Sequence, residues 1–384
     1  MNFLELQPPP LSLYVHLPWC ESKCPYCDFN SHPLKTALPE QEYIKAICVD
    51  LESEAEAFKD RELRTIFFGG GTPSLFSSSS IKKILDRVGG LVEISKQLEV
   101  TIEANPGSSE IRKFDGFLAA GVNRLSLGAQ SFSDKQLCAL GRLHNSEAAS
   151  SGILAAQQAG FKNINIDLMF GLPDQTKNEA LNDLHIALSF EAPHVSLYQL
   201  TIEPNTYFSK YPPLLPTIDT DWEIRTAIYN KAKERGYHRY EVSAFSKTGY
   251  QCQHNLNVWG FGDYIGVGAG AHGKTTSVNG IFRYSKEKHP SRYIDKALSG
   301  ASLASKSAVA PKDLCFEFML NALRLKKGFQ LKDFTRKTGV SWSFLFRPLT
   351  VAQNKGLLEI NGSTVCATSL GYRFLDDLVE LFLP

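Results

Sequence analysis

The stretch LSLYVHLPWCESKCPYCDFN, residues 11–30, decides how the rest of the chain is interpreted. Its first seven residues are apolar, aromatic or β-branched and follow three consecutive prolines, a pattern that predicts a buried strand. A loop with proline at either side of its first cysteines comes next and carries Cys20, Cys24 and Cys27. The sequence thus predicts a cysteine cluster directly after the first strand.

From this strand onward, the first half of the chain alternates strand and helix patterns. Further short apolar runs predict strands at 65–68, 98–103, 124–127, 164–169 and 195–200. Helical spacing and strong helix formers predict helices at 40–58, 80–88, 109–120, 146–159 and 177–189. Such alternation is typical of a parallel sheet with right-handed crossovers. Six strands fall short of the eight of a closed barrel, so we predict an α/β fold with an open, partial (β/α)6 barrel.

After residue 201 the pattern changes. A connection with several prolines and tyrosines, 204–216, leads to a predicted helix at 219–235, a strand at 237–244 and a glycine-rich stretch at 260–273. The end of the chain predicts helices at 312–325, 331–337, 343–354 and 370–382, with a hairpin at 357–367 that turns at Asn361-Gly362. We therefore expect three parts, which are the partial barrel at 1–215, a barrel extension at 216–305 and a winged-helix-like α+β domain at 306–384.

Composition excludes several classes of protein. Lys+Arg 41 against Asp+Glu 40 gives a net charge of +1, which offers no electrostatic footprint for sequence-blind nucleic-acid binding. Eight cysteines in 384 residues are too few for a disulfide scaffold. No apolar run approaches the roughly 18 residues that cross a bilayer, and no charged segment suggests a signal peptide before the first basic residue, Lys23. We expect a cytoplasmic protein that is not an integral membrane protein and binds no nucleic acid.

The cysteine cluster predicts a metal site. Three thiolates on one short loop can hold three irons of a [4Fe–4S] cluster and leave the fourth iron without a protein ligand. A zinc site is the alternative, and zinc would require a fourth ligand. The candidates for that fourth ligand are His16, Asp28 and His32.

The surroundings of the cluster favour the iron–sulfur site. The spacing Cys-x3-Cys-x2-Cys, an aromatic residue (Tyr26) before the third cysteine, and Gly-Gly-Gly-Thr-Pro at 69–73 after a predicted strand resemble the radical S-adenosylmethionine superfamily. The resemblance implies a [4Fe–4S] cluster on Cys20, Cys24 and Cys27, S-adenosylmethionine chelated by the open iron, and an external electron donor. One electron then cleaves the sulfonium to give a 5′-deoxyadenosyl radical.

Two segments narrow the resemblance. YVHLPWC at 14–20 and CPYCDFN at 24–30 are similar to the oxygen-independent coproporphyrinogen III oxidase group, and within it to the haem chaperone branch, the HemW family. Phe29 stands where the oxidase branch, HemN, has a further cysteine, and the segment before the first strand is shorter than in that branch. These differences favour haem chaperoning over oxidative decarboxylation of coproporphyrinogen III, which is the alternative function.

Residues at the ends of the predicted strands form the candidate S-adenosylmethionine pocket. Glycines permit close approach of a ligand to the backbone, and ligand-binding side chains of β/α barrels collect at the carboxyl ends of the strands. The resemblance implies contacts with S-adenosylmethionine from Tyr14, Tyr26, Gly70, Gly71, Thr72, Glu103, Gln130, Arg142 and Asp167. In that family acidic groups accept hydrogen bonds from the ribose hydroxyls or the amine of S-adenosylmethionine, and arginine binds its carboxylate. A structural ion pair of Glu103 with Arg142 is the alternative. Tyr198 and Gln199, which end the sixth strand, are weaker candidates.

A further segment predicts a haem contact. HNLNVW at 254–259 is similar to the HNxxYW motif that is associated with haem in the HemW family, with Val258 in place of tyrosine. The resemblance implies that His254 and Trp259 contact haem, and neutral histidine is a common iron ligand. A hydrogen-bonded loop histidine is the alternative for His254. His272 is a second candidate ligand or a residue of the adenosine pocket, and a thiolate ligand at Cys252 stays open.

The resemblance also implies partners. The acceptor of haem would be another protein, and a membrane-bound respiratory haemoprotein fits that role. DNA binding by the winged-helix-like domain is a rival hypothesis, but helix 343–354 carries Arg347 as its only positive charge. The aromatic residues near that helix, Trp342, Phe344 and Phe346, favour instead a lid that packs over the barrel mouth.

Overall fold

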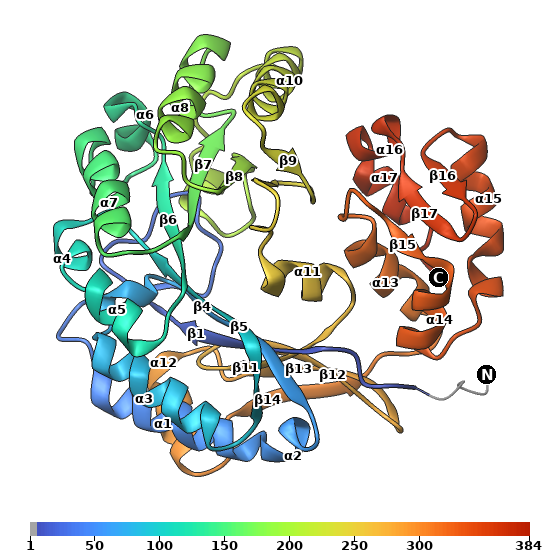
Figure 1. The fold of residues 1–384 in the computed structure, drawn as a ribbon, viewed down its shortest axis with the longest axis horizontal. Helices are drawn as coiled ribbons and strands as arrows, with labels where there is room; N and C mark the ends of the chain where they lie inside the picture. The colour runs from blue at the N-terminus through green and yellow to red at the C-terminus, as the bar shows by residue number, and fades with distance from the viewer. Residues whose placement is uncertain (1–5) are drawn as a thin grey trace.

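The computed structural model describes residues 6–384 and is built around one twelve-stranded sheet (Figure 1). Six parallel strands form its centre, in the order in which they follow along the chain. They are β1 (Leu11–Leu17), β4 (Glu62–Gly70), β5 (Glu93–Ala104), β6 (Arg124–Gln130), β7 (Asn163–Phe170) and β8 (His194–Gln199). These are the six predicted strands, so the partial barrel is confirmed. Residues 1–5 of the first predicted part lie outside the described residues.

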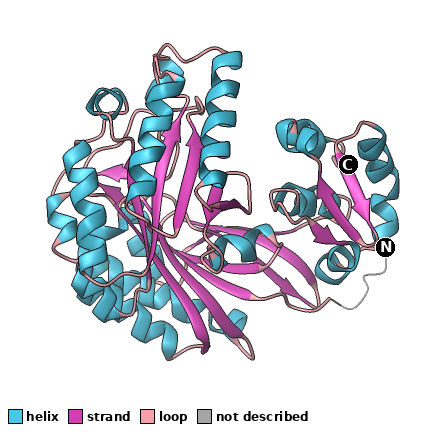
Figure 2. Ribbon diagram, turned by 45° about the horizontal axis from the view of Figure 1, so that its top comes forward, coloured by secondary structure: helices cyan, strands magenta, loops and turns pink. Residues whose placement is uncertain are grey.

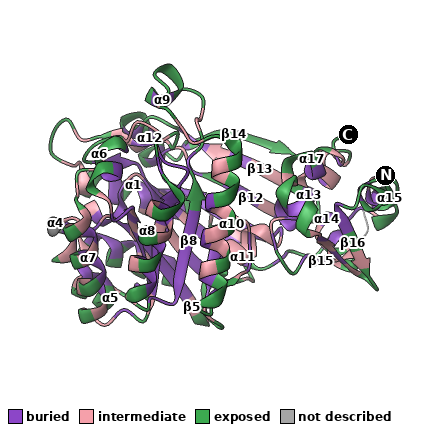
Figure 3. Ribbon diagram, turned by 90° about the horizontal axis from the view of Figure 1, so that it is seen from above, coloured by how far each residue is buried: buried purple, intermediate pink, exposed green. Residues whose placement is uncertain are grey.

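Helices cover the outer face of these strands (Figure 2). The main crossover helices are α1 (Glu40–Ser53), α3 (Ser78–Gly89), α5 (Phe114–Ala120), α7 (Ser146–Gln158) and α8 (Lys177–Ser189). Alternate apolar residues of the strands, such as Leu13, Val15 and Ile102, are buried beneath them. In Figure 3 the strands are largely buried, and the helices that cover them expose their outward faces.

Two predicted helices are each interrupted. The helix predicted at 40–58 ends at Ser53, whose hydroxyl donates to the carbonyl of Asp50 (2.7 Å), and a short α2 (Ala55–Phe58) follows. A side-chain bond of this kind competes with continuation of the helix. The helix predicted at 109–120 is likewise divided into α4 (Ser108–Ile111) and α5.

The inner face of the parallel strands is polar. In register across β1, β4 and β5 lie Ser12, Thr65 and Glu99, and one layer higher Thr101 of β5 pairs with Arg124 of β6. Branched aliphatic side chains usually fill the interior of a β/α barrel. A polar interior therefore indicates a lumen that is built to bind a ligand.

Both edges of the sheet extend beyond the six parallel strands. β11 (Asp263–Val267), which comes from the glycine-rich stretch, pairs parallel with β1, and three antiparallel strands follow it. They are β12 (His272–Ser277), β13 (Gly280–Lys286) and β14 (Leu303–Ala308), none of which was predicted from the sequence. The helix α12 (Pro290–Leu298) separates the last two.

The strand predicted at 237–244 on the other edge is wrong. The chain instead forms β9 (His238–Arg239) and β10 (Ala244–Ser246), which pair antiparallel with each other. The Glu241 carboxylate accepts bonds from the Ser243 N–H (3.0 Å) and hydroxyl (2.9 Å), and these bonds fold the chain into a turn. The preceding helix, α10 (Ile218–Glu234), agrees with the prediction within one residue at each end.

The C-terminal part forms a separate cluster of buried side chains. It contains α13 (Leu314–Ala322), α14 (Leu331–Thr338) and α15 (Phe346–Asn354), and a sheet in the order β15 (Phe329–Gln330), β17 (Thr364–Ala367), β16 (Leu358–Asn361). The predicted hairpin is therefore present, while the third strand is only two residues long and was missed. The last predicted helix, 370–382, is split into α16 (Ser369–Arg373) and α17 (Leu375–Glu380).

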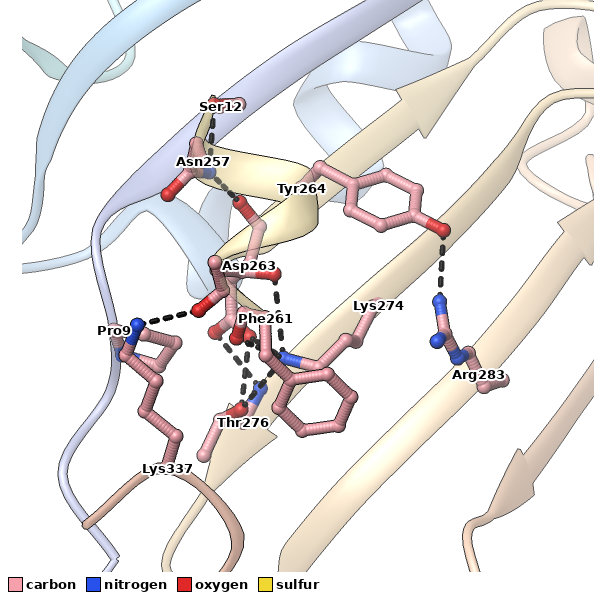
Figure 4. A network of polar contacts seen from close by, with 12 residues as sticks. Pro9, Ser12, Asn257, Phe261, Asp263, Tyr264, Lys274, Thr276, Arg283 and Lys337 are labelled. Carbon is pink, nitrogen blue, oxygen red and sulfur yellow. Dashed lines mark hydrogen bonds and ion pairs between the residues drawn. The ribbon is translucent and has the colours of Figure 1, made fainter. Parts of the chain in front are cut away.

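A buried ion network lies where α11 (Gln253–Trp259) meets the sheet (Figure 4). The Asp263 carboxylate accepts from Lys274 Nζ (2.9 Å), from the Thr276 hydroxyl (2.8 Å) and from Arg61 (3.0 Å). From the C-terminal part, Lys337 donates to the carbonyl of Gly260, one residue after α11.

None of the helices between residues 6 and 384 combines the length and the apolar character that a bilayer crossing requires.

Candidate cofactor site

The cysteine loop begins where β1 ends. Its two sides are held together by β2 (Trp19–Cys20) and β3 (His32–Pro33), which pair parallel. Lys23 Nζ donates to the carbonyls of Phe29 (3.0 Å) and Ser31 (3.3 Å), and the Cys27 N–H donates to the carbonyl of Cys24 (3.1 Å). The loop is therefore closed by backbone and lysine contacts that leave its thiols free of disulfides.

The three thiols lie on one loop, but their sulfur atoms are not close enough together to bind one metal ion as they stand. Burial, together with the neighbouring Cys27 and Cys24, raises the pKa of Cys20 to about 11. Among residues 6–384, no group of three His, Cys, Asp or Glu side chains is close enough to hold a metal ion. Three soft sulfur donors on eight residues nevertheless fit an iron–sulfur cluster in their chemistry, and binding it would require loss of their protons.

His16 is committed to hydrogen bonds and is a poor fourth ligand for zinc. Its Nδ1 is 3.0 Å from the Tyr14 hydroxyl and its Nε2 is 2.9 Å from the carbonyl of Asn30. Burial lowers the pKa of His16 to about 4, so the ring is neutral at physiological pH. Both ring nitrogens are thereby occupied, which argues against the zinc alternative at this residue.

Arg142 reaches the cysteine loop from the segment after β6. Its guanidinium donates to Cys24 Sγ (3.5 Å), to Asn105 Oδ1 (2.5 Å) and to the carbonyl of Gly128 (3.0 Å). No ion pair joins it to Glu103 within the described part of the chain, so the structural ion pair that was the alternative is not formed. A cation at this distance stabilises a thiolate.

The glycines at the end of β4 are packed tightly. Gly70 has φ +122°, and a Cβ there would lie 2.8 Å from the His16 ring, while a Cβ on Gly71 would lie 2.4 Å from the carbonyl of Trp19. Thr72 is buried, and its hydroxyl accepts from the Asn105 amide (3.1 Å). Packing alone thus requires glycine at 70 and 71, whatever ligand approaches them.

Among the described residues, no basic group lies at ion-pair distance from two carboxyl groups that face the lumen. Glu103 accepts from the Gly70 N–H (3.2 Å), and burial together with the charge of Asp167 raises the pKa of Glu103 to about 8. Asp167 accepts from the Ser126 hydroxyl (2.9 Å) and the Asn165 amide (2.8 Å), and burial raises its pKa as well. These groups suit a ligand that donates hydrogen bonds or carries positive charge.

A cavity of about 760 Å³ opens at the carboxyl ends of the strands. This volume lies in the upper part of the range of about 300–1,000 Å³ that small-molecule sites occupy. Of the predicted site residues, the cavity is lined by Tyr14, Cys27, Gly70, Glu103 and His272. The others are not part of its lining, namely Cys20, Cys24, Tyr26, Gly71, Thr72, Gln130, Arg142, Asp167, His254 and Trp259. No residue of 306–384 lines it either, so the expected lid over the mouth is not formed at this cavity.

His254 lies apart from this cavity, on α11, with 6% of its surface exposed. The Thr65 hydroxyl donates to Ser12 Oγ (2.7 Å), so its oxygen accepts from the Nδ1–H of His254 (2.9 Å). This arrangement assigns the proton to Nδ1 and leaves the lone pair on Nε2. Burial and the charge of Arg124 lower the pKa of His254 to about 3.

The other haem candidates differ in environment. Trp259 packs beneath the guanidinium of Arg324, which lies 4.2 Å from its ring centre and belongs to the C-terminal part. Cys252 is fully buried and donates to Glu99 (3.5 Å), and burial raises its pKa to about 12, which disfavours a thiolate. His272 is exposed at the cavity mouth.

Some lining residues were missed as members of this cavity. They include Asn30, Tyr264 and Lys288, along with His16, which had been considered only for zinc. Strand alternation could have found His16, since it lies two residues from Tyr14 on the same face of β1. Nothing local in the sequence indicates Lys288, because its segment reaches the mouth only through β11–β13.

Comparison with known proteins agrees with this architecture. The radical SAM superfamily matches residues 14–187, and the HemN C-terminal domain matches residues 309–374. Heme chaperone HemW of Haemophilus influenzae is 46% identical over 98% of both chains, and heme chaperone HemW of Escherichia coli is 45% identical over 98% of both. Heme chaperone HemW of Bacillus subtilis is 35% identical over 97% of this chain and 99% of the relative.

A solved structure supports the fold. Coproporphyrinogen III oxidase (HemN) from Escherichia coli superimposes with a TM-score of 0.82 over 98% of this chain and 90% of its own. The two are 20% identical, so the likeness establishes the shared architecture of barrel and C-terminal domain. Taken with the relatives above, the chain belongs to the HemW family of the radical SAM superfamily.

Proposed function

We propose that this protein binds haem and delivers it to acceptor proteins. The observation that carries the proposal is the identity of 46%, over 98% of both chains, with a protein named heme chaperone HemW. The match covers the C-terminal domain as well as the barrel, so the likeness extends beyond the barrel scaffold. We also propose domain boundaries at residues 215 and 305. The large sheet continues past the first boundary, because β10 pairs with β8 and β11 pairs with β1.

The cysteine loop is proposed to hold a [4Fe–4S] cluster, with S-adenosylmethionine beside it. Cys20, Cys24 and Cys27 would supply the thiolates, and the open iron of such a cluster supplies a coordination site for an amine and a carboxylate. Arg142, which donates to Cys24, supports this proposal because one guanidinium can serve both the thiolate and a ligand carboxylate. Glu103 and Asp167 would take hydrogen bonds from the ligand's amine or ribose hydroxyls.

Binding of S-adenosylmethionine is expected to depend on pH through Glu103. Its pKa of about 8 means that the free carboxyl is mostly protonated at pH 7. A ligand that donates hydrogen bonds selects the carboxylate, so affinity should strengthen as pH rises through about 8 and level off above it. Equilibrium dialysis with labelled S-adenosylmethionine should show this slope, and Glu103→Gln should flatten it and weaken binding about tenfold. An unchanged slope in the variant would remove Glu103 from the site.

His254 is proposed as the haem iron ligand, through Nε2. A ring that donates Nδ1–H to a fixed acceptor has its tautomer and orientation set for metal binding at Nε2, and its low pKa keeps that nitrogen free of protons. Because only 6% of the surface of His254 is exposed, α11 has to shift away from the sheet before Nε2 can reach an iron.

His254→Ala is expected to move the Soret band and to weaken haem binding at least about tenfold. The matched control is His185→Ala, which removes an exposed histidine from α8 and should leave the titration unchanged. If His254→Ala binds haem with the wild-type spectrum, the ligand lies elsewhere, and His272 is the next candidate. Thermal unfolding of the variant separates loss of a ligand from loss of the fold.

Delivery is tested by transfer. When haem-loaded protein is mixed with an apo-haemoprotein of distinct spectrum, haem should transfer to the acceptor faster than it does from albumin.

The acceptor in the cell is proposed to be a membrane-bound respiratory haemoprotein. The free thiols support a reducing compartment such as the cytoplasm. Loss of coproporphyrinogen III in step with formation of methionine and 5′-deoxyadenosine would instead favour the oxidase alternative.

A further inference from the structure

The mouth of the cavity carries basic groups that have no acidic partner. Lys23, Lys288 and His272 all line it and are exposed. Within residues 6–384 none of the three forms an ion pair; Lys23 donates only to the backbone carbonyls of its own loop. Of the two acids in the lining, Glu103 lies within the lumen and is largely protonated at pH 7 because its pKa is about 8, and Asp28 is exposed. Because burial and Lys288 lower the pKa of His272, its ring is neutral, and the mouth carries the two lysine charges of Lys23 and Lys288 against the one exposed carboxylate of Asp28.

Asn30 fixes these groups relative to the cysteine loop. Its amide donates to the carbonyls of Ala269 (2.8 Å) and Lys288 (2.9 Å), so one side chain ties the loop to both segments of the barrel extension. Gly270 permits this approach, since a Cβ there would lie 2.4 Å from the Asn30 amide nitrogen. His272 and Lys288 line the same cavity, and burial together with the nearby charge of Lys288 lowers the pKa of His272.

An exposed aromatic ring stands beside the basic groups. Phe29 lines the same cavity, with 61% of its surface exposed, two residues after Cys27. An exposed phenylalanine next to unpaired cations suits a flat apolar ligand with carboxylates on its edge, because the ring packs on the face while the cations meet the edge.

We propose that the mouth of the cavity is the propionate site of the bound porphyrin, with Lys288 and His272 meeting a carboxylate and Phe29 packing on the macrocycle. The proposal rests on the proposed haem-binding function and deepens it by locating one edge of the ligand. It requires the shift of α11 proposed above, because Thr65, which holds His254, lies five residues before Gly70 on β4. S-adenosylmethionine does not account for these groups, since its single carboxylate has Arg142 and its positive charge is repelled by lysine.

The test removes the charge first from the protein, at Lys288, and then from the ligand, at the haem propionates. Wild-type protein and Lys288→Gln are titrated with haem and with haem dimethyl ester, in which both propionates are neutral. The matched control is Lys162→Gln, an exposed lysine next to the start of β7 and therefore at the other end of the parallel strands. Lys288→Gln should weaken haem binding about tenfold and leave binding of the ester unchanged, while Lys162→Gln should change neither.

The outcomes separate this proposal from the proposed function. If wild-type protein binds no haem, the haem-binding function itself fails. If it binds haem, but Lys288→Gln and His272→Gln both bind haem and the ester as wild type does, the propionates lie elsewhere and only this proposal is overturned. If Lys288→Gln weakens haem and ester equally, the lysine acts on the fold of the mouth and not on a carboxylate, which also overturns it.

Discussion

Replacement of Cys24 by alanine is expected to abolish the iron–sulfur absorption of reconstituted protein and, with it, binding of S-adenosylmethionine. Three thiolates are the fewest that can hold a [4Fe–4S] cluster with one open iron, so the loss of one leaves no stable site. Arg142 would then lose its sulfur partner as well. Absorption in the visible range, iron content and equilibrium dialysis of S-adenosylmethionine measure the effect, all under anaerobic conditions.

The control for this variant is Cys138→Ala, which removes an exposed thiol from α6 (Asp134–Ala139). It should retain full iron content and absorption, because Cys138 is outside the cysteine loop. A Cys24→Ala protein with a full complement of four irons would contradict the assignment of the three ligands.

Replacement of Asp263 by asparagine is expected to have the largest effect on stability. The carboxylate is fully buried and compensates Lys274, of which only 1% is exposed, and Arg61. Removal of one partner of a buried pair leaves an uncompensated charge and costs about 3–5 kcal/mol of unfolding free energy. Urea unfolding followed by circular dichroism measures this cost.

Asp86→Asn is the matched control. Asp86 pairs with Lys82 on the exposed face of α3, with 62% and 55% of their side chains accessible. An exposed pair of this spacing contributes only about 0.3–0.5 kcal/mol, so the variant should unfold nearly as wild type does. Equal losses in the two variants would show that the network around Asp263 contributes no more than a surface pair.

Local patterns in the sequence were sufficient for the parallel half of the fold. The six strands are short apolar runs between amphipathic helices, and each was found because one strand face packs under helices. The antiparallel strands β12–β14 were missed since their residues are mixed in character. Lys274 is buried by pairing with Asp263 of the neighbouring strand β11, and Lys286 by pairing with Asp50, which is 236 residues away along the chain. Buried charges of this kind interrupt the alternation of apolar and polar residues that marks a strand.

The candidate site could be predicted only in part, for a similar reason. Glu103 and Asp167 were expected at strand ends from their positions, and Tyr14 was expected through the family resemblance; of these three, Tyr14 and Glu103 line the cavity. The burial of His254 depends on Thr65 and Glu99, which are more than 150 residues away along the chain. The basic mouth depends in the same way on the contact of Asn30 with residues 269 and 288.

An anaerobic titration of cluster-reconstituted protein with haem, followed by the Soret band, tests the central claim most directly. We predict saturation at one haem per chain. A titration that never saturates, or that only reproduces the spectrum of free haem, would contradict the account and favour the porphyrinogen oxidase alternative.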